Sequence, residues 1–179
     1  MSKDMFVSEE EFRRLLSAEV EFTRKLVENA KPVSLLPRLA VTGVRAEGQP
    51  REIRVFGLDV SLNDSEEKRR LFEGLGARCY AEQFCPLAAF VTTEAWLSTQ
   101  TEVQPRRDPK RQEAVVISGR TIDGRDCVAM APVFRDTGNV IRLGKFDDCA
   151  GQSESLLLNA FFGSFMKAAF GDLKGKGKL

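Results

Sequence analysis

The dipeptide Asp123-Gly124 constrains the fold of this chain more than any other short segment. It separates residues 111–122 from a second run, 127–133, and both flanks are rich in Val, Ile and Ala. Asp-Gly between two such runs is the strongest local signal for a β-hairpin, because the tight turn needs positive φ at its central residues. Strands joined by so short a turn are antiparallel. The sequence therefore predicts an antiparallel sheet built around this hairpin.

Four further segments predict strands of the same sheet. Residues 33–46 and 51–60 are rich in Val, Ile, Leu and Phe, and the turn cluster between them indicates a second hairpin. Residues 84–98 place alternate side chains on two faces, as a strand does. The turn-forming residues 136–139 lead into a last predicted strand over 140–146.

Three helices accompany these strands. Ser8 and Glu11 form a capping box that starts a helix over 8–30. The apolar stripe expected to be buried on this helix consists of Phe12, Leu15, Leu16, Phe22 and Leu26. A second helix follows the cap 63–65, and Gly74 and Gly76 weaken its end. The third, over 153–170, is apolar around most of its circumference, so the domain or a partner must bury it.

The element order α-β-β-α-β-β-β-β-α predicts an α+β domain, with a central antiparallel sheet of five to six strands flanked by three helices. That order resembles the profilin-like and roadblock-like architecture, whose members act mainly as dimerisation and docking platforms. We expect one domain over residues 1–170. The Lys- and Gly-rich segment 171–179 is expected to be a disordered tail.

The overall charge favours no particular class of partner. The chain has 27 Lys and Arg against 26 Asp and Glu, a net charge of +1. Its N-terminus lacks the apolar run of a secretory signal, and the charge-free stretch 155–166 is shorter than the ~20 residues that cross a bilayer. We expect a cytoplasmic protein that does not enter a membrane. The four cysteines are then expected to be free, small, buried side chains, not disulfides or zinc ligands.

The chain contains no histidine. This excludes Ser-His-acid triads, Cys-His dyads and histidine-bearing zinc sites. Catalysis would have to use carboxylates, Lys, Tyr, a Cys of low pKa or a metal held by oxygen ligands. The absence therefore favours binding over catalysis.

Candidate catalytic groups are few. The candidate acids for a magnesium site are Glu94, Glu113, Asp126, Asp147 and Asp148, although exposed carboxylates at strand ends are commonplace. Val115 stands where a nuclease of the Glu-x-Lys type has its lysine. Cys127 is a candidate nucleophile without an identifiable base. No glycine-rich phosphate loop is present, and we predict neither a cofactor nor a resident metal.

One segment resembles a known family. Glu94-Ala95-Trp96-Leu97-Ser98, followed by residues 105–116, is similar to a segment that recurs in uncharacterised bacterial and phage-associated proteins. In that family a strand ending in Glu-Ala-Trp leads through a Pro-Asp-Pro-x-Arg-x-Glu loop into the next strand. Here Arg106-Arg107 stand where a small polar residue usually precedes the Asp. No activity is attached to the family, so the resemblance implies no catalytic residues.

The loop in this segment is strongly basic. Arg106, Arg107, Lys110 and Arg111 lie near two stiffening prolines and form a candidate site for phosphate or a polyanion such as nucleic acid. Trp96 is a candidate for stacking on a base. The alternatives are an ordinary solvated loop and a tryptophan packed beneath a helix.

Three functions remain open from the sequence. The one it favours is a non-catalytic protein-interaction or assembly domain that forms a homo-oligomer or binds another protein. The second is a polyanion binder that uses the basic loop, and the third is a carboxylate or cysteine enzyme. The oligomer interface is expected on the last helix, at Phe161, Phe162, Phe165 and Met166.

Overall fold

The computed structural model describes residues 6–32, 34–58, 65–98, 108, 110–148 and 155–175, with side chains as far as Gly171. Over these residues it contains three helices and a seven-stranded sheet. The elements are α1 (Glu9–Ala30), β1 (Arg38–Val44), β2 (Glu52–Gly57), α2 (Ser65–Ala81), β3 (Cys85–Leu97), β4 (Gln112–Thr121), β5 (Asp126–Arg135), β6 (Ile141–Leu143), β7 (Asp147–Asp148) and α3 (Leu156–Gly175). The predicted α+β class and element order are confirmed. β6 lies within the last predicted strand, 140–146, and the two-residue β7 follows it as an additional strand.

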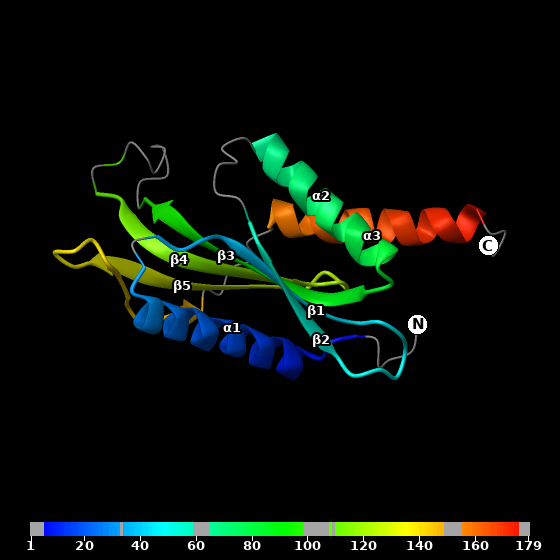
Figure 1. Ribbon diagram of the computed structural model, residues 1–179, viewed down its shortest axis with the longest axis horizontal. Helices are drawn as coiled ribbons and strands as arrows, with labels where there is room; N and C mark the ends of the chain where they lie inside the picture. Colours follow the sequence, from blue (N-terminus) through cyan, green and yellow to red (C-terminus); the bar gives the residue numbers. More distant parts are fainter. Residues whose placement is uncertain are drawn as a thin grey trace.

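The sheet separates two helical layers, with α1 on one face and α2 and α3 on the other (Figure 1). Its strand order is β2-β1-β3-β4-β5-β6, and β7 also pairs with β5. Every pairing is antiparallel. The longest strand, β3, lies between β1 and β4, so the two predicted hairpins are joined through it.

The Asp123-Gly124 turn joins β4 to β5 as the sequence predicts. Of the two turn residues only Gly124 has positive φ, at +91°, and the Thr121 amide donates to the carbonyl oxygen of Arg125 at 2.9 Å. Gly119, two residues before the end of β4, pairs with Phe90 of β3. A Cβ at Gly119 would lie 2.5 Å from the Phe90 ring, so the ring occupies the space that a side chain would need.

Helix α1 begins at the predicted cap, where Ser8 Oγ accepts the Glu11 amide at 3.1 Å. Its buried side chains are Phe12, Leu16, Thr23 and Val27. Only the first two belong to the predicted stripe. Phe22 is instead 51% exposed, because the second half of the helix turns Thr23 toward a buried polar group on the sheet.

Helices α2 and α3 pack against each other and against β1 and β3. Helix α2 continues through Gly74 and Gly76 to Ala81, so the two glycines expected to weaken its end lie inside the helix. Helix α3 runs to Gly175, five residues into the segment predicted to be a disordered tail, and residues 176–179 lie outside the described chain. No helix of the described residues combines the length and apolar character needed to span a bilayer.

Candidate interaction surface

Helix α3 is buried by the chain itself. Phe161, Phe162 and Phe165 are almost fully enclosed in a cluster with Phe72 of α2, and Met166 packs at its margin. The apolar surface that suggested an interface on this helix is therefore largely satisfied by intramolecular packing. The large apolar side chains that remain well exposed on the described part of α3 are Leu156 and Phe170, near its two ends.

The predicted basic site is only partly described. Arg106 and Arg107 lie outside the described residues, while Lys110 is exposed and Arg111 places its guanidinium 4.6 Å from the ring centroid of Trp96. Trp96 is 47% exposed, so it is not packed beneath a helix. The structure brings Trp96 and Arg111 together, and this arrangement combines a cation with an aromatic surface.

The acidic residue of this loop has a structural role. Asp108 is fully buried, and its carboxylate accepts the Lys110 amide at 2.8 Å and a short hydrogen bond from the Ser98 hydroxyl. These bonds tie the end of β3 to the start of β4. The Asp108 carboxylate is therefore turned inward and anchors the loop.

The candidate metal-binding acids do not gather into one site. Glu94 lies 3.8 Å from the Arg135 guanidinium, and Glu113 forms a shorter ion pair with the same group. Asp126 instead pairs with Arg120 at 2.8 Å, and β7 carries the other two acids. The pKa of Glu94 is raised, mainly by burial and further by the charge of Glu113 and a hydrogen bond with it. The Leu35 amide and Arg135 act in the opposite direction and lower this pKa. Within the described residues no group of three or more potential ligands is placed to hold a metal ion.

The described cysteines are not activated. Burial raises the pKa of Cys127 to about 12 and that of Cys79 to about 11, and it also raises the pKa of Cys85. A nucleophilic cysteine needs the opposite shift, because the thiolate is the reactive form. The environment of Cys127 thus gives no support to its candidate role as a nucleophile.

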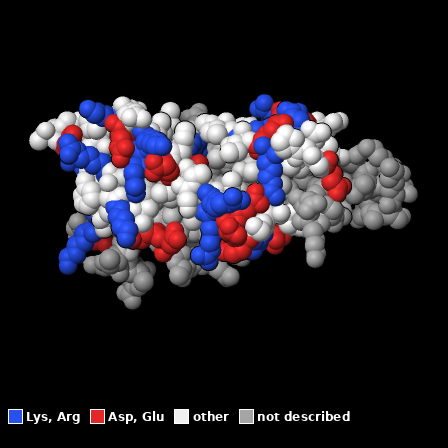
Figure 2. Space-filling view, turned by 90° about the horizontal axis from the view of Figure 1, so that it is seen from below, with Lys and Arg blue, Asp and Glu red and all other residues white. Residues whose placement is uncertain are grey.

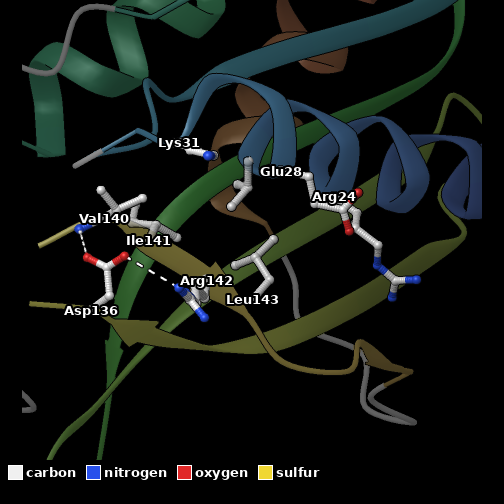
Figure 3. A pocket seen from close by; sticks show the side chains of 9 residues that line it. Arg24, Glu28, Lys31, Asp136, Val140, Ile141, Arg142 and Leu143 are labelled. Carbon is white, nitrogen blue, oxygen red and sulfur yellow. Dashed lines mark hydrogen bonds and ion pairs between the residues drawn. The ribbon is translucent and has the colours of Figure 1, made fainter. Parts of the chain in front are cut away.

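A hollow of about 390 Å³ lies between the end of α1 and the β5–β6 turn (Figure 3). Its rim carries Arg24, Glu28, Lys31, Asp136 and Arg142. Asp136 accepts the Gly138 and Val140 amides at 2.9 and 3.0 Å, and lies 3.7 Å from Arg142. The Arg24 guanidinium points away from Asp136 and Arg142 in Figure 3. The cations of the rim therefore do not converge on one point where a shared anion would bind.

A second hollow, about 300 Å³ and lined mainly by apolar side chains, lies between α1 and the β1–β2 hairpin. We call it the α1–β2 groove, and its lining is formed by Leu15, Ala18, Glu19, Phe22, Arg38, Ala40, Thr42, Ile53, Val55 and Phe90. Ile53 is 66% exposed and Val55 57% exposed, both on β2. Figure 2 looks onto this side of the molecule and shows charged side chains in separate groups, with uncharged surface between them.

A buried ion pair supports the inner side of this groove. Arg38 of β1 donates from Nε and Nη2 to Glu19 Oε1 of α1, at 3.0 and 2.6 Å. Two threonines complete the cluster. Arg38 Nη2 also donates to Thr23 Oγ1 at 2.6 Å, and Thr92 Oγ1 donates to Glu19 Oε1 at 2.7 Å. The Phe22 ring lies 4.6 Å from the Arg38 guanidinium. These contacts tie α1 to β1 and β3. The apolar side chains of α1 pack further across β4, β5 and β6, away from β2.

The outer side of the groove is the edge of the sheet. Among the described strands, β2 pairs only with β1, in a register without a bulge. The Leu58 amide donates to the carbonyl oxygen of Pro37 at 2.8 Å. Since backbone groups alternate in direction along an antiparallel strand, the N–H and C=O groups of Ile53, Val55 and Gly57 point away from β1. They form a row of hydrogen-bonding groups along the free edge.

The opposite edge of the sheet is different. There β5 pairs with the three residues of β6 and the two residues of β7, and the segment between them breaks the edge. Short, interrupted edge strands are a common protection against pairing with another chain. The six residues of β2 are continuous and carry exposed apolar side chains, so β2 lacks this protection.

No protein-family model, no curated protein and no solved structure matches this chain. The resemblances to a bacterial and phage-associated family and to the profilin-like architecture therefore remain expectations. The α1–β2 groove was not predicted as a site. Its signal is the alternation of Ile53 and Val55 with Glu52 and Arg54, but this pattern does not reveal which face a helix covers.

Proposed function

We propose that this chain is a protein-interaction domain that binds by strand addition. An extended segment of the partner pairs with the free edge of β2, and its apolar side chains pack on Ile53 and Val55 and enter the α1–β2 groove. In this mode of recognition, backbone hydrogen bonds supply affinity and pockets for alternate side chains supply specificity. The proposal keeps the function favoured by the sequence and moves its surface from α3 to β2.

The observation that carries the proposal is the exposure of Ile53 and Val55 on a continuous edge strand. Exposed, apolar edge strands pair readily with other chains, and natural proteins usually block them. A fixed apolar groove beside the edge adds a binding surface that an aggregation-prone strand alone would lack. The buried Glu19–Arg38 pair supports this groove from within.

Site-specific photo-crosslinking in the host cell tests the proposal. A photo-activatable phenylalanine analogue replaces Val55 in the full chain, and the matched control carries it at Leu36, which is 68% exposed but lies outside the groove. We expect a covalent adduct of defined mass from position 55 and none from position 36. No adduct at 55, or the same adduct from both positions, would contradict strand addition at β2.

A further inference from the structure

We propose that the partner at this edge is a second copy of the chain, and that the two β2 strands pair antiparallel around a two-fold axis beside Ile53. This inference rests on the proposed function, because it identifies the partner of the same edge. Three features of β2 bear on this pairing: the direction of its backbone groups, the order of its charges and the position of its apolar residues.

Backbone direction restricts the possible registers. In an antiparallel pair, two facing residues either both point their N–H and C=O groups across the pair or both point them away. Neighbouring residues of β2 differ in this direction, so a symmetric pair must place the axis on a residue and not between two residues. For good overlap of β2 the axis then falls on Ile53, Arg54 or Val55.

The charges distinguish these three registers. With the axis at Ile53, Glu52 of each copy faces Arg54 of the other, which gives two opposite-charge pairs on one face of the joined sheet. With the axis at Arg54, two guanidinium groups face each other, and directly opposed like charges destabilise a sheet. With the axis at Val55, Arg54 faces Phe56 and Glu52 faces Leu58, so neither charge meets its opposite. Charge complementarity therefore selects the register centred on Ile53.

The apolar residues take unequal places in this register. Ile53 packs on its counterpart at the axis, and each Val55 faces Arg51 of the other copy on the same face. A two-fold axis perpendicular to the sheet keeps both α1 helices on one side, so the two α1–β2 grooves adjoin and their apolar linings face a common space. The arrangement closes after two copies, because each β2 edge is used once and the opposite edge is interrupted.

Cysteine cross-linking tests the register in the full chain. In hydrogen-bonded antiparallel pairs the facing Cα atoms are ~5.5 Å apart, a separation that suits a disulfide. In the proposed register two residues at position 55 are offset by four residues, about 13 Å along the strand. Under mild oxidation we expect I53C to form a covalent dimer at least tenfold faster than V55C, L36C or the wild type, which controls for the native cysteines. Faster cross-linking of V55C than of I53C would overturn the register.

Charge reversal provides a second measurement that does not depend on disulfide chemistry. We expect E52R to raise the dimer dissociation constant at least tenfold in sedimentation equilibrium, and E52R/R54E to restore it toward the wild-type value. Glu52 also pairs with Arg45, and Arg54 with Glu82, so thermal melts must show that both variants are folded. A folded double variant that stays as weak as E52R would overturn the Glu52–Arg54 pairing.

The outcomes separate the two proposals. A wild-type chain that sediments as a monomer at high concentration overturns the self-partner inference. If the photo-crosslinked adduct at position 55 then contains another protein, strand addition at β2 still holds. If position 55 gives no adduct at all, both proposals fail.

Discussion

Helices α2 and α3 approach so closely at Gly76 that a side chain there should destabilise the protein. A Cβ placed on Gly76 would lie 2.1 Å from the carbonyl oxygen of Phe161 and 3.2 Å from the amide nitrogen of Phe165. Ordinary contact begins at 3.4 Å, so the two helices would have to separate by about 1.3 Å. The obstructing atoms belong to the backbone of α3, and a change of side-chain rotamer cannot relieve the clash.

Two opposing effects set the magnitude for Gly76→Ala. Alanine is favoured over glycine in a helix interior by about 1 kcal/mol. Overpacking in a dense core costs typically 1–3 kcal/mol, and a gap of 0.5–1 Å between packed surfaces forfeits about a quarter to a half of their dispersion energy. Because Phe72, Leu158, Phe161 and Phe165 all belong to this cluster, we take the upper part of the overpacking range. The expected net loss is about 1–2 kcal/mol.

Gly74 is the matched control. It lies two residues earlier in the same helix, and a Cβ there meets nothing within 4 Å. Gly74→Ala should therefore stabilise the protein by about 0.5–1 kcal/mol. At roughly 2–4 °C per kcal/mol for a chain of this size, Tm should rise by a few degrees for G74A and fall by a few degrees for G76A. Urea denaturation and thermal melts measure both, and a G76A variant as stable as the wild type would refute the close helix contact.

Three further predictions concern buried or partly buried ionisable groups. Glu19→Ala leaves Arg38 buried without its partner and should lower the free energy of unfolding, measured in urea, by about 3–5 kcal/mol. Glu21→Ala removes a member of an exposed helix pair and should change this free energy by no more than about 0.5 kcal/mol. Equal effects of the two substitutions would contradict the buried pair. Cys127, with a pKa raised to about 12, should react with iodoacetamide at pH 8 roughly a hundredfold or more slowly in the folded than in the urea-unfolded protein, as peptide mass spectrometry can show. Burial raises the Glu94 pKa above 4.5, so the folded state holds this proton more tightly than the unfolded state, and the contribution of Glu94 to stability should fall as the pH rises through the raised pKa. Glu94→Gln should therefore gain stability relative to the wild type between pH 4 and pH 7, and a constant difference would refute the shift.

The features that the sequence predicted correctly depend on local chemistry. The Asp123-Gly124 turn and the Ser8 cap each involve residues that are close along the chain, so their geometry follows from residue type. The antiparallel class then follows from two short turns. These local signals were sufficient for the fold class, the element order and most element bounds.

The sequence-based predictions fail where the environment of a residue is set by a part of the chain that is distant in sequence. Helix α2 tolerates Gly76 because α3 packs closely against it, a contact that joins residues far apart in the sequence. Thr23 replaces Phe22 on the buried face of α1 because Arg38 and Thr92 bring a polar cluster beneath it. The α1–β2 groove was missed for the same reason, since its lining depends on which strands α1 covers.

The width of the sheet explains why β2 is uncovered. Six neighbouring strands at ~4.8 Å spacing span about 24 Å, whereas a helix with its side chains is about 10–12 Å wide. One helix therefore cannot cover the whole face; α1 packs across β3, β4, β5 and β6, and its Glu19–Arg38 pair reaches β1. The edge strand β2 lies beyond this helix, and a monomer would be expected to carry polar side chains there. Since β2 instead directs Ile53 and Val55 to this face and Glu52 and Arg54 to the other, its composition fits an edge that another strand covers.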